Sequence, residues 1–459
     1  MSKLIYSIVA LAVSLLTANL ASAQPKQLSP RPTPRQLAWQ QLETTAFLHF
    51  TVNTFTDKEW GEGTEDPQIF NPTQLDARQW IRTLRDAGFR MAIITAKHHD
   101  GFCLWPSKLT EHSVKNSPWK NGKGDVVREV ADACREFGLK FGVYLSPWDR
   151  HEPRYGTAAY NDYYKAQLRE LLTNYGPIAE VWFDGAKGEN AKDMTYDFDG
   201  YWALVRELQP QAVMFSDAGP DVRWVGNEAG NAGETCWSMI NTEGMAPGVA
   251  DAKYLNTGDP TGKRWIPAET DVSIRPGWFY HPAEDTNVRS AQNLVNLYYQ
   301  SVGRNSLLLL NVPPNRDGLF SEPDIESLKA FRRILNETFK TNLVAKDAKL
   351  TDSKLATFVT LQANQPLTIN LNGEQTFDRL SIQENIASGQ RVASGRVDYW
   401  NGSDWQSLAT FTTVGYKRLL RFPAIKTSRI RLTFTNASGP VELAEVGAFK
   451  ASAGEGSAK

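Results

Sequence analysis

The stretch DVVREVADACREFGLKFGVYLS, residues 125–146, contains a helix followed by a strand. Asp125 is a favourable N-cap, and Gly138 is the kind of residue that commonly ends a helix. Between them apolar side chains recur every three or four residues, at Val127, Val130, Cys134 and Phe137. The apolar run Phe141–Leu145 follows after a short turn. The stretch therefore predicts one helix–strand unit of an α/β protein.

The same unit recurs from residue 45 to about residue 340. The predicted strands are Ala46–Phe50, Met91–Thr95, Phe141–Leu145, Ala179–Phe183, Ala212–Ser216, Thr235–Met239, Trp265–Glu269 and Leu307–Asn311. The predicted helices are Leu75–Ala87, Val126–Phe137, Asp162–Tyr175, Tyr196–Leu208 and Thr286–Val302. This alternation predicts a (β/α)8-like barrel of the TIM type. Residues 240–264, rich in Gly, Asn and Asp, show no helical pattern, so we expect the sixth helix to be short or missing.

The pattern changes after the barrel. Residues 355–449 show period-two runs separated by Asn-Gly and Ala-Ser-Gly turns, which predicts an antiparallel β-sandwich. The expected divisions are a signal peptide over 1–23, a catalytic barrel over 24–342, the sandwich over 343–450 and a disordered tail over 451–459.

The first residues have the pattern of an export signal. Lys3 precedes the apolar run Leu4–Leu16, and Ala21-Ser22-Ala23 forms a small-residue cleavage site before Gln24. The run is too short for a comfortable bilayer span, and no cysteine follows the expected cut. We therefore expect an exported protein, periplasmic or secreted, without a stable membrane anchor.

Composition excludes several classes of function. The 459 residues include 50 basic and 51 acidic side chains, so the near-zero net charge argues against nucleic acid and anionic membranes as partners. Three scattered cysteines support neither a disulfide framework nor a cysteine zinc site. The 14 Trp residues suit either a large core or the apolar faces of sugar rings. The sequence leaves the oligomeric state open.

In barrels of this type the active site lies at the C-terminal ends of the strands. Most of the segments that follow the predicted strands combine an aromatic side chain with a charged or imidazole group, which is typical of a sugar pocket. The candidate sugar-binding residues there are His49, Glu59, Trp60, His98, His99, Tyr144, Trp182, Glu269 and Trp278.

Two carboxyl groups are candidates for acid–base and nucleophilic chemistry. Asp184 ends the apolar run Val181–Phe183, where it would be either a nucleophile or a simple helix cap or ion-pair partner. Glu228 lies on a Gly-rich loop and is the candidate acid/base; alternatively it is an ordinary solvated glutamate. Glu59 and Glu269 compete with it for the acid role.

The pair His98-His99 raises the question of a metal. Adjacent side chains on a strand point to opposite faces, so we expect these imidazoles to bind sugar hydroxyls and expect neither a metal nor another cofactor. A metal-dependent barrel hydrolase is the alternative.

Several motifs together resemble the α-L-fucosidases of glycoside hydrolase family 29. They are His49-Phe50, Glu59-Trp60, Lys97-His98-His99-Asp100-Gly101-Phe102, Tyr144-Leu145-Ser146, Trp182-Phe183-Asp184-Gly185 and Gly226-Asn227-Glu228. The resemblance implies a barrel followed by a β-sandwich and a retaining double-displacement mechanism.

Position by position, the resemblance implies that Asp184 is the nucleophile. It implies a fucose pocket of His49, Glu59, Trp60, His98, His99, Tyr144 and Trp182, with Trp278 closing around the methyl side of the sugar.

The Gly-Asn-Glu context of Glu228 resembles the branch selective for α-1,3/1,4-linked fucose on Lewis-type glycans, so fucosylated oligosaccharides or glycoconjugates are the expected partners. The alternatives are a broad-specificity α-L-fucosidase and a non-catalytic fucose-binding protein.

Overall fold

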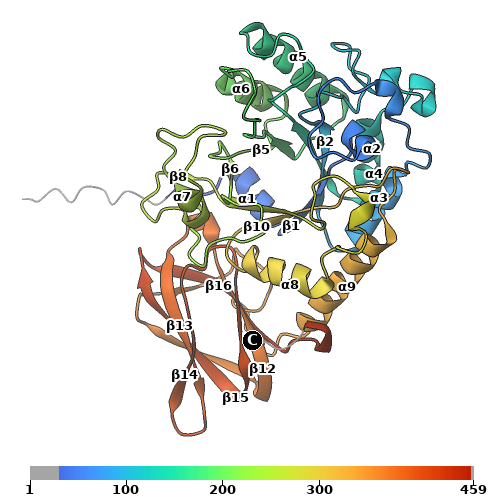
Figure 1. Ribbon diagram of the computed structural model, residues 1–459. Coiled ribbons are helices and arrows are strands. Elements are labelled where there is room, and N and C mark those ends of the chain that lie inside the picture. Colours follow the sequence, from blue (N-terminus) through green and yellow to red (C-terminus); the bar gives the residue numbers. More distant parts are fainter. Residues whose placement is uncertain (1–29, 456–459) are drawn as a thin grey trace, which may run out of the picture.

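The computed structural model describes residues 30–455 and contains a barrel followed by a β-domain (Figure 1). The proposed signal peptide lies outside the described residues. Eight parallel strands close the barrel in the order β1-β10-β9-β6-β5-β4-β3-β2. Their bounds are β1 Thr44–Leu48, β2 Met91–Lys97, β3 Lys140–Leu145, β4 Glu180–Trp182, β5 Val213–Ser216, β6 Val222–Trp224, β9 Ala268–Ser273 and β10 Leu307–Asn311. The predicted barrel is thus confirmed.

Helices surround the barrel on its outer side (Figure 1). The quoted stretch folds as expected: Asp125 Oδ1 accepts a hydrogen bond from Arg128 N at 2.8 Å, and Gly138 adopts the left-handed conformation at φ 77°. The outer helices are α2 Val52–Thr56, α3 Ala77–Asp86, α4 Val126–Phe137, α5 Ala159–Asn174, α6 Phe198–Leu208, α8 Ala291–Gln300 and α9 Glu322–Thr338. Within residues 30–455 none of the helices is long and apolar enough to cross a bilayer.

The sixth strand differs from the prediction. The barrel strand is Val222–Trp224, only five residues after β5, so no helix separates strands five and six. The run predicted as strand six contributes only β7 (Met239–Ile240), which pairs antiparallel with β8 (Arg264–Trp265) outside the barrel. The sixth helix is reduced to α7 (Ala252–Thr257), as expected. A three-residue strand is too short to show a periodicity in the sequence.

Aromatic side chains fill the barrel interior. Helix α1 (Pro34–Gln40) brings Trp39 to the N-terminal end of the barrel, where its Nε1 donates to Glu180 Oε2 at 2.7 Å. Towards the C-terminal end, Trp182 stacks on Phe215 with the ring centroids 3.8 Å apart. The interior is therefore a packed core, and its upper layer is aromatic.

The β-domain consists of one antiparallel sheet in the order β11-β16-β12-β15-β13-β14. Its long strands contain register shifts, at which such strands bend, and the sheet encloses a hydrophobic core of its own. The predicted antiparallel β-domain is thus confirmed. The bounds are β11 Val359–Leu361, β12 Pro366–Glu384, β13 Val392–Trp400, β14 Trp405–Phe411, β15 Arg418–Ala437 and β16 Val441–Phe449.

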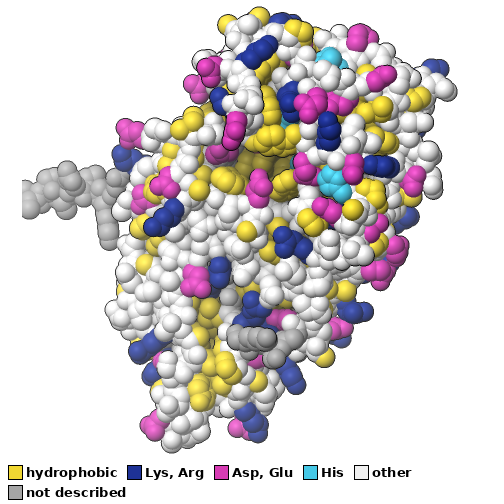
Figure 2. All heavy atoms as spheres, viewed as in Figure 1, with side chains coloured by type: hydrophobic (Ala, Val, Ile, Leu, Met, Phe, Trp, Pro, Cys, Tyr) yellow, Lys and Arg dark blue, Asp and Glu magenta, His cyan; other side chains and the backbone are white. Residues whose placement is uncertain are grey.

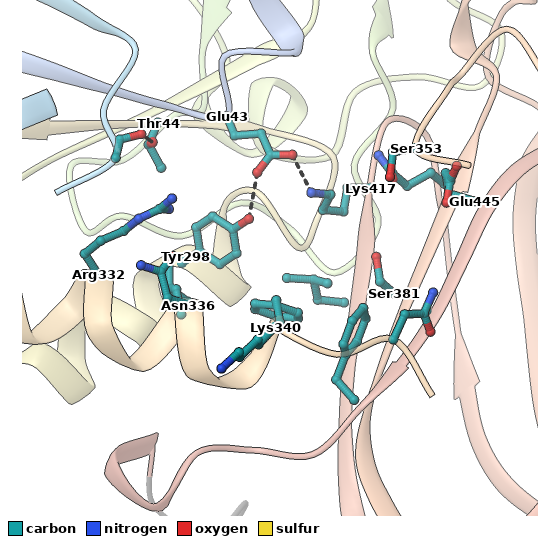
Figure 3. Close-up of a pocket in the computed structure, with 18 of the residues that line it drawn as sticks. Glu43, Thr44, Tyr298, Arg332, Asn336, Lys340, Ser353, Ser381, Lys417 and Glu445 are labelled. Atoms are coloured by element: carbon teal, nitrogen blue, oxygen red, sulfur yellow. Dashed lines mark hydrogen bonds and ion pairs between the residues drawn. The ribbon is translucent and has the colours of Figure 1, made fainter. Parts of the chain in front are cut away.

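Glu43 connects the two domains at a cleft of about 1040 Å³ (Figure 3). Its Oε2 accepts from Tyr298 OH of the barrel at 2.7 Å, and its Oε1 accepts from Tyr416 OH of the β-domain at 3.0 Å and from the Lys417 ammonium. Burial opposes the charged form of Glu43, but the charge of Lys417 and the hydrogen bonds from Lys417, Tyr298 and Tyr416 together lower its pKa. A charged carboxylate therefore holds the domains together at the end of the barrel remote from the strand C-termini.

The β-domain also holds the irregular segment between β6 and β9. Gln390 Oε1 accepts from Ser238 N at 2.8 Å, and Gln390 Nε2 donates to Cys236 O at 3.1 Å. Thr413 Oγ1 accepts from Cys236 N at 2.9 Å. A segment that lacks a helix thus satisfies its backbone groups through side chains of the other domain.

The prediction of a disordered tail from residue 451 is wrong for residues 451–455. Glu455 is buried, with Oε1 2.7 Å from Arg379 Nε and Oε2 accepting from Thr338 Oγ1 at 2.8 Å. The tail is therefore attached to the β-domain through a buried ion pair and to helix α9 of the barrel through a hydrogen bond, which its Gly- and Ser-rich composition does not reveal.

Candidate active site

A pocket of about 520 Å³ opens at the C-terminal ends of the barrel strands. Figure 2 shows a hydrophobic hollow surrounded by acidic and basic side chains on this face of the molecule. Nine of the predicted site residues line the pocket: His49, Trp60, His98, His99, Tyr144, Trp182, Asp184, Glu228 and Trp278. The strands that carry them are far apart in the sequence, so the closed barrel is what brings these residues together.

Asp184 follows β4 and has both carboxylate oxygens engaged. Oδ2 accepts from Tyr144 OH at 2.8 Å, and Oδ1 accepts from Ala186 N at 2.7 Å. His99 Nε2 lies 3.8 Å from Oδ2. Because the next helix begins only at Phe198, Asp184 caps no helix. Its partners instead orient the carboxylate within the pocket.

Glu228 lies on the loop after β6, and its Oε2 accepts from Trp278 Nε1 at 3.3 Å. Burial raises the pKa of Glu228, and the negative charges of Asp184 and Glu59 add to this effect, although the bond from Trp278 opposes it. The environment of Glu228 therefore favours its protonated form.

The tautomer of His49 follows from its hydrogen bonds. Asn311 Nδ2 donates to Trp278 O at 2.7 Å, so Asn311 Oδ1 must be the acceptor that lies 2.8 Å from His49 Nδ1. Burial lowers the pKa of His49 to about 4. Neutral His49 therefore carries its proton on Nδ1 and offers Nε2 as an acceptor.

The same reasoning applies to His99. Ser146 Oγ must donate to the carbonyl of Trp148 at 2.6 Å, so it accepts from His99 Nδ1 at 2.7 Å. Burial lowers the pKa of His99 to about 4. His99 Nε2 is thus a second uncharged acceptor, suited to the O–H donors of a sugar.

His98 and His99 do not point to opposite faces, which corrects the expectation from the sequence. Strand β2 ends at Lys97, and residues 98–101 form a turn, so both imidazoles line the pocket with ring centroids 4.0 Å apart. Within the described part of the chain, the buried Nδ1 of His98 has no hydrogen-bond partner. Among residues 30–455 no three His, Cys, Asp or Glu side chains are arranged to hold a metal ion.

Glu59 lies behind the wall of the pocket and does not line it. Its Oε2 accepts from Trp278 N at 2.8 Å, and its Oε1 accepts from Phe279 N at 3.1 Å and lies 2.7 Å from His281 Nε2. Glu59 therefore holds the loop that carries Trp278. Its neighbour Trp60 lines the pocket and is 44% exposed.

Glu269 is neither a pocket residue nor a candidate acid in the structure, which corrects its proposed role. It is fully buried inside the barrel, where its Oε1 accepts from Trp182 Nε1 at 2.7 Å. Burial and the nearby carboxylate of Glu180 raise the pKa of Glu269 well above its usual range. Glu269 supports Trp182 from within the barrel.

The sequence analysis missed two further carboxyl groups in the pocket, Asp217 and Asp271. Asp271 Oδ1 accepts from Trp224 Nε1 at 2.9 Å, and burial together with the charge of Glu228 raises its pKa well above the usual range. Period-two alternation could have found it, because Asp271 lies on the same face of β9 as Glu269 and one step nearer the pocket. Asp217 Oδ2 accepts from Gly248 N at 2.7 Å, and burial raises its pKa to about 6.

A β/α barrel whose C-terminal face holds carboxyl groups, neutral imidazoles and indole rings is a glycoside hydrolase by its fold and site. The chain belongs to the α-L-fucosidase family, glycoside hydrolase family 29, whose family model matches residues 33–338. It is a retaining α-L-fucosidase, and the expected enzyme class is confirmed.

Comparisons with individual proteins agree. The chain is 47% identical to alpha-L-fucosidase 1 of Arabidopsis thaliana over 447 residues, which cover 92% of this chain and 88% of the plant protein. It is similar to SpGH29, with 42% identity, a TM-score of 0.88 and coverage of 92% of this chain and 99% of the other. A Ruminococcus gnavus GH29 fucosidase in complex with fucose is 33% identical, with a TM-score of 0.85 and coverage of 95% and 98%.

Substitution of Glu269 tests its supporting role. Glu269→Leu leaves the indole N–H of Trp182 without an acceptor inside the barrel, so we expect it to lower the free energy of unfolding by about 1–3 kcal/mol. We also expect a lower kcat/KM, because Trp182 lines the pocket. Urea denaturation and assays with an aryl fucoside measure the two effects. Glu269→Gln keeps the acceptor and is the matched control, so equal damage in both variants would contradict the assignment.

Proposed function

We propose that this α-L-fucosidase is an exported enzyme that releases L-fucose from α-1,3/1,4-fucosylated glycans, with Asp184 as nucleophile and Glu228 as acid/base. The observation that carries the assignment is the pair of contrasting carboxyl groups in one pocket. Asp184 is held by the Tyr144 hydroxyl and the Ala186 amide. Glu228 lies at the exposed rim of the pocket, where desolvation of its carboxyl and the charges of Asp184 and Glu59 raise its pKa.

In the first step the Asp184 carboxylate attacks the anomeric carbon while protonated Glu228 gives its proton to the departing glycosidic oxygen. Because the pKa of Glu228 is raised, the protonated form that donates in this step is favoured. In the second step the ionised Glu228 takes a proton from water, which attacks the same carbon and releases Asp184. Two inversions at the anomeric carbon give net retention.

Fucose has hydroxyls on most of its ring and a methyl group in place of a hydroxymethyl group. His49 Nε2 and His99 Nε2 are uncharged acceptors for such hydroxyls. The rings of Trp182, Phe215 and Phe47 form an apolar floor, with Phe47 4.9 Å from Trp182 between centroids. Trp278 and Trp60 offer apolar surface for the methyl group at the mouth.

Replacing the two carboxyl groups tests the double displacement. Asp184→Gly should abolish turnover, and azide should restore part of it by entering where the carboxylate stood, giving the inverted β-fucosyl azide. Glu228→Ala should slow cleavage of natural glycans by about 10²–10⁴-fold, and slow aryl fucosides with good leaving groups less, because these need no proton. Full activity of the Asp184 variant, or equal losses on both substrates for the Glu228 variant, would contradict these roles. Binding of fucose without turnover by the unaltered protein would favour a non-catalytic fucose-binding protein.

The linkage preference follows from the Gly226-Asn227-Glu228 context, which resembles the α-1,3/1,4-selective branch. We expect fucose release from Lewis-type trisaccharides and from other α-1,3- and α-1,4-linked glycans, with little from α-1,2- or α-1,6-linked ones. A panel of the four linkages, with released fucose quantified, measures this preference. Efficient α-1,2 or α-1,6 cleavage would support the broad-specificity alternative.

The proposal of export rests on the signal-peptide pattern of residues 1–23, which lie outside the described part of the chain. We expect the mature protein to begin at Gln24 and to be found in the periplasm or the medium. N-terminal sequencing and cell fractionation measure this, with Ala23→Arg as a cleavage-blocked control that should accumulate as precursor. A cytoplasmic protein that retains Met1 would overturn the proposal.

A further inference from the structure

His281 lies between two carboxylates that come from a different loop. Its Nδ1 is 2.9 Å from Asp57 Oδ1, and its Nε2 is 2.7 Å from Glu59 Oε1. Asp57 and Glu59 belong to the loop after β1, whereas His281 follows β9. The imidazole therefore bridges two loops whose neighbouring residues, Trp60 and Trp278, line the pocket.

The charge of His281 follows from these contacts. A carboxylate oxygen can only accept, so each ring nitrogen must carry a proton for both hydrogen bonds to form. A neutral imidazole has one N–H, and its second nitrogen would turn a lone pair towards a negative charge. The geometry thus requires an imidazolium, stabilised by two charge-assisted hydrogen bonds.

The surroundings of His281 fit a cation. The carboxylates of Glu59, Asp57 and Glu284 favour its charged form and together raise its pKa, although partial burial opposes them. Arg316 is the cation in this group, with its Nη2 3.5 Å from Asp57 Oδ1. Among residues 30–455 the acidic groups that act on His281 therefore outnumber Arg316.

Gly277 makes the close approach of the two loops possible. A Cβ at this position would lie 2.5 Å from Glu59 Oε1 and 2.9 Å from His281 Cδ2, too close for either atom. The same Glu59 carboxylate accepts from the amides of Trp278 and Phe279. Three groups of the loop after β9 therefore bond to the Glu59 carboxylate: the amides of Trp278 and Phe279 and the imidazole of His281.

We propose that His281 is a positioning residue whose imidazolium joins the loop after β1 to the loop after β9, and so holds Trp60 and Trp278 at the mouth of the pocket. Loss of the imidazolium proton removes one of the two hydrogen bonds and loosens the mouth. The inference rests on the proposed binding of the sugar in this pocket. Because the folded form stabilises the charged imidazole, the link is complete at low pH and is lost as pH rises through the raised pKa of His281.

Direct titration tests the charge without relying on activity. The chain has six histidines, so selective ¹³C labelling of histidine gives a small set of ring signals, and His281→Gln identifies the one required. We expect this signal to titrate above the usual range of histidine. Asp57→Asn removes one carboxylate but keeps the shape, so it should move the midpoint down by about one pH unit. A midpoint at or below the usual value, unchanged by Asp57→Asn, would overturn the proposal.

Kinetics test the positioning role once the titration of Glu228 has been removed. In the Glu228→Ala background, with an aryl fucoside that needs no acid, we expect KM to rise about tenfold as pH passes the His281 midpoint. Adding His281→Gln should raise KM at all pH values and abolish the dependence. Gly277→Ala, which displaces Glu59 without changing any charge, should have the same effect. His151→Gln is the control: His151 Nδ1 lies 2.7 Å from the carbonyl oxygen of Gly63, and its ring stacks on His112, so the substitution should leave the pH dependence in place.

The outcomes separate this inference from the proposed function. If fucosides are not cleaved but the His281 midpoint is raised and falls in Asp57→Asn, the link stands and the proposed function fails. If fucosides are cleaved with a KM that does not depend on pH, and His281→Gln leaves KM unchanged, the positioning role of His281 is wrong.

Discussion

The pairing of β1 with β10 closes the barrel, and the pocket depends on this closure. Phe47 of β1 lies beside Asn311 of β10 in register, although 264 positions separate them in the chain. The closure allows Asn311 to orient the imidazole of His49. It also lets the carboxylate of Glu59 accept hydrogen bonds from the backbone amides of Trp278 and Phe279. The side chain of Asn311, on the last barrel strand, thus decides which nitrogen of His49 is left as an acceptor in the pocket.

Burial is the second constraint, and it acts differently on groups that are close in space. It keeps His49 and His99 neutral, with pKa values lowered to about 4, so that they can accept from hydroxyls. The same desolvation favours the protonated form of Glu228. Where two carboxylates surround an imidazole near the surface, at His281, charge outweighs desolvation and the cation is favoured. Neutral imidazoles in the pocket and a charged one in the loop beside it therefore coexist because their partners differ.

The sequence predicts the barrel, the antiparallel β-domain and most of the pocket, because buried strands and their polar C-terminal residues are local patterns. It fails where the decisive fact is not local. Strand β6 has three residues and is recognised only by its neighbours β5 and β9. Glu269 and Asp271 share one strand face, and only their depth in the barrel decides that Asp271 reaches the pocket. His98 and His99 share the pocket because strand β2 ends at Lys97, just before them, and the chain turns there. The partners of His281 come from more than 200 residues away.

The chain has no helix between β5 and β6 and only the short helix α7 before β9. This irregular connection is the segment that carries Glu228. A regular helix directly after β6 would leave little room for the loop that brings Glu228 to the pocket. The chain instead forms a long excursion, and its backbone groups need partners that a helix would have supplied. Gln390 and Thr413 of the β-domain supply some of them, at Cys236 and Ser238. The β-domain thus supports the segment that carries the candidate acid/base, which gives a physical reason for its attachment to this barrel.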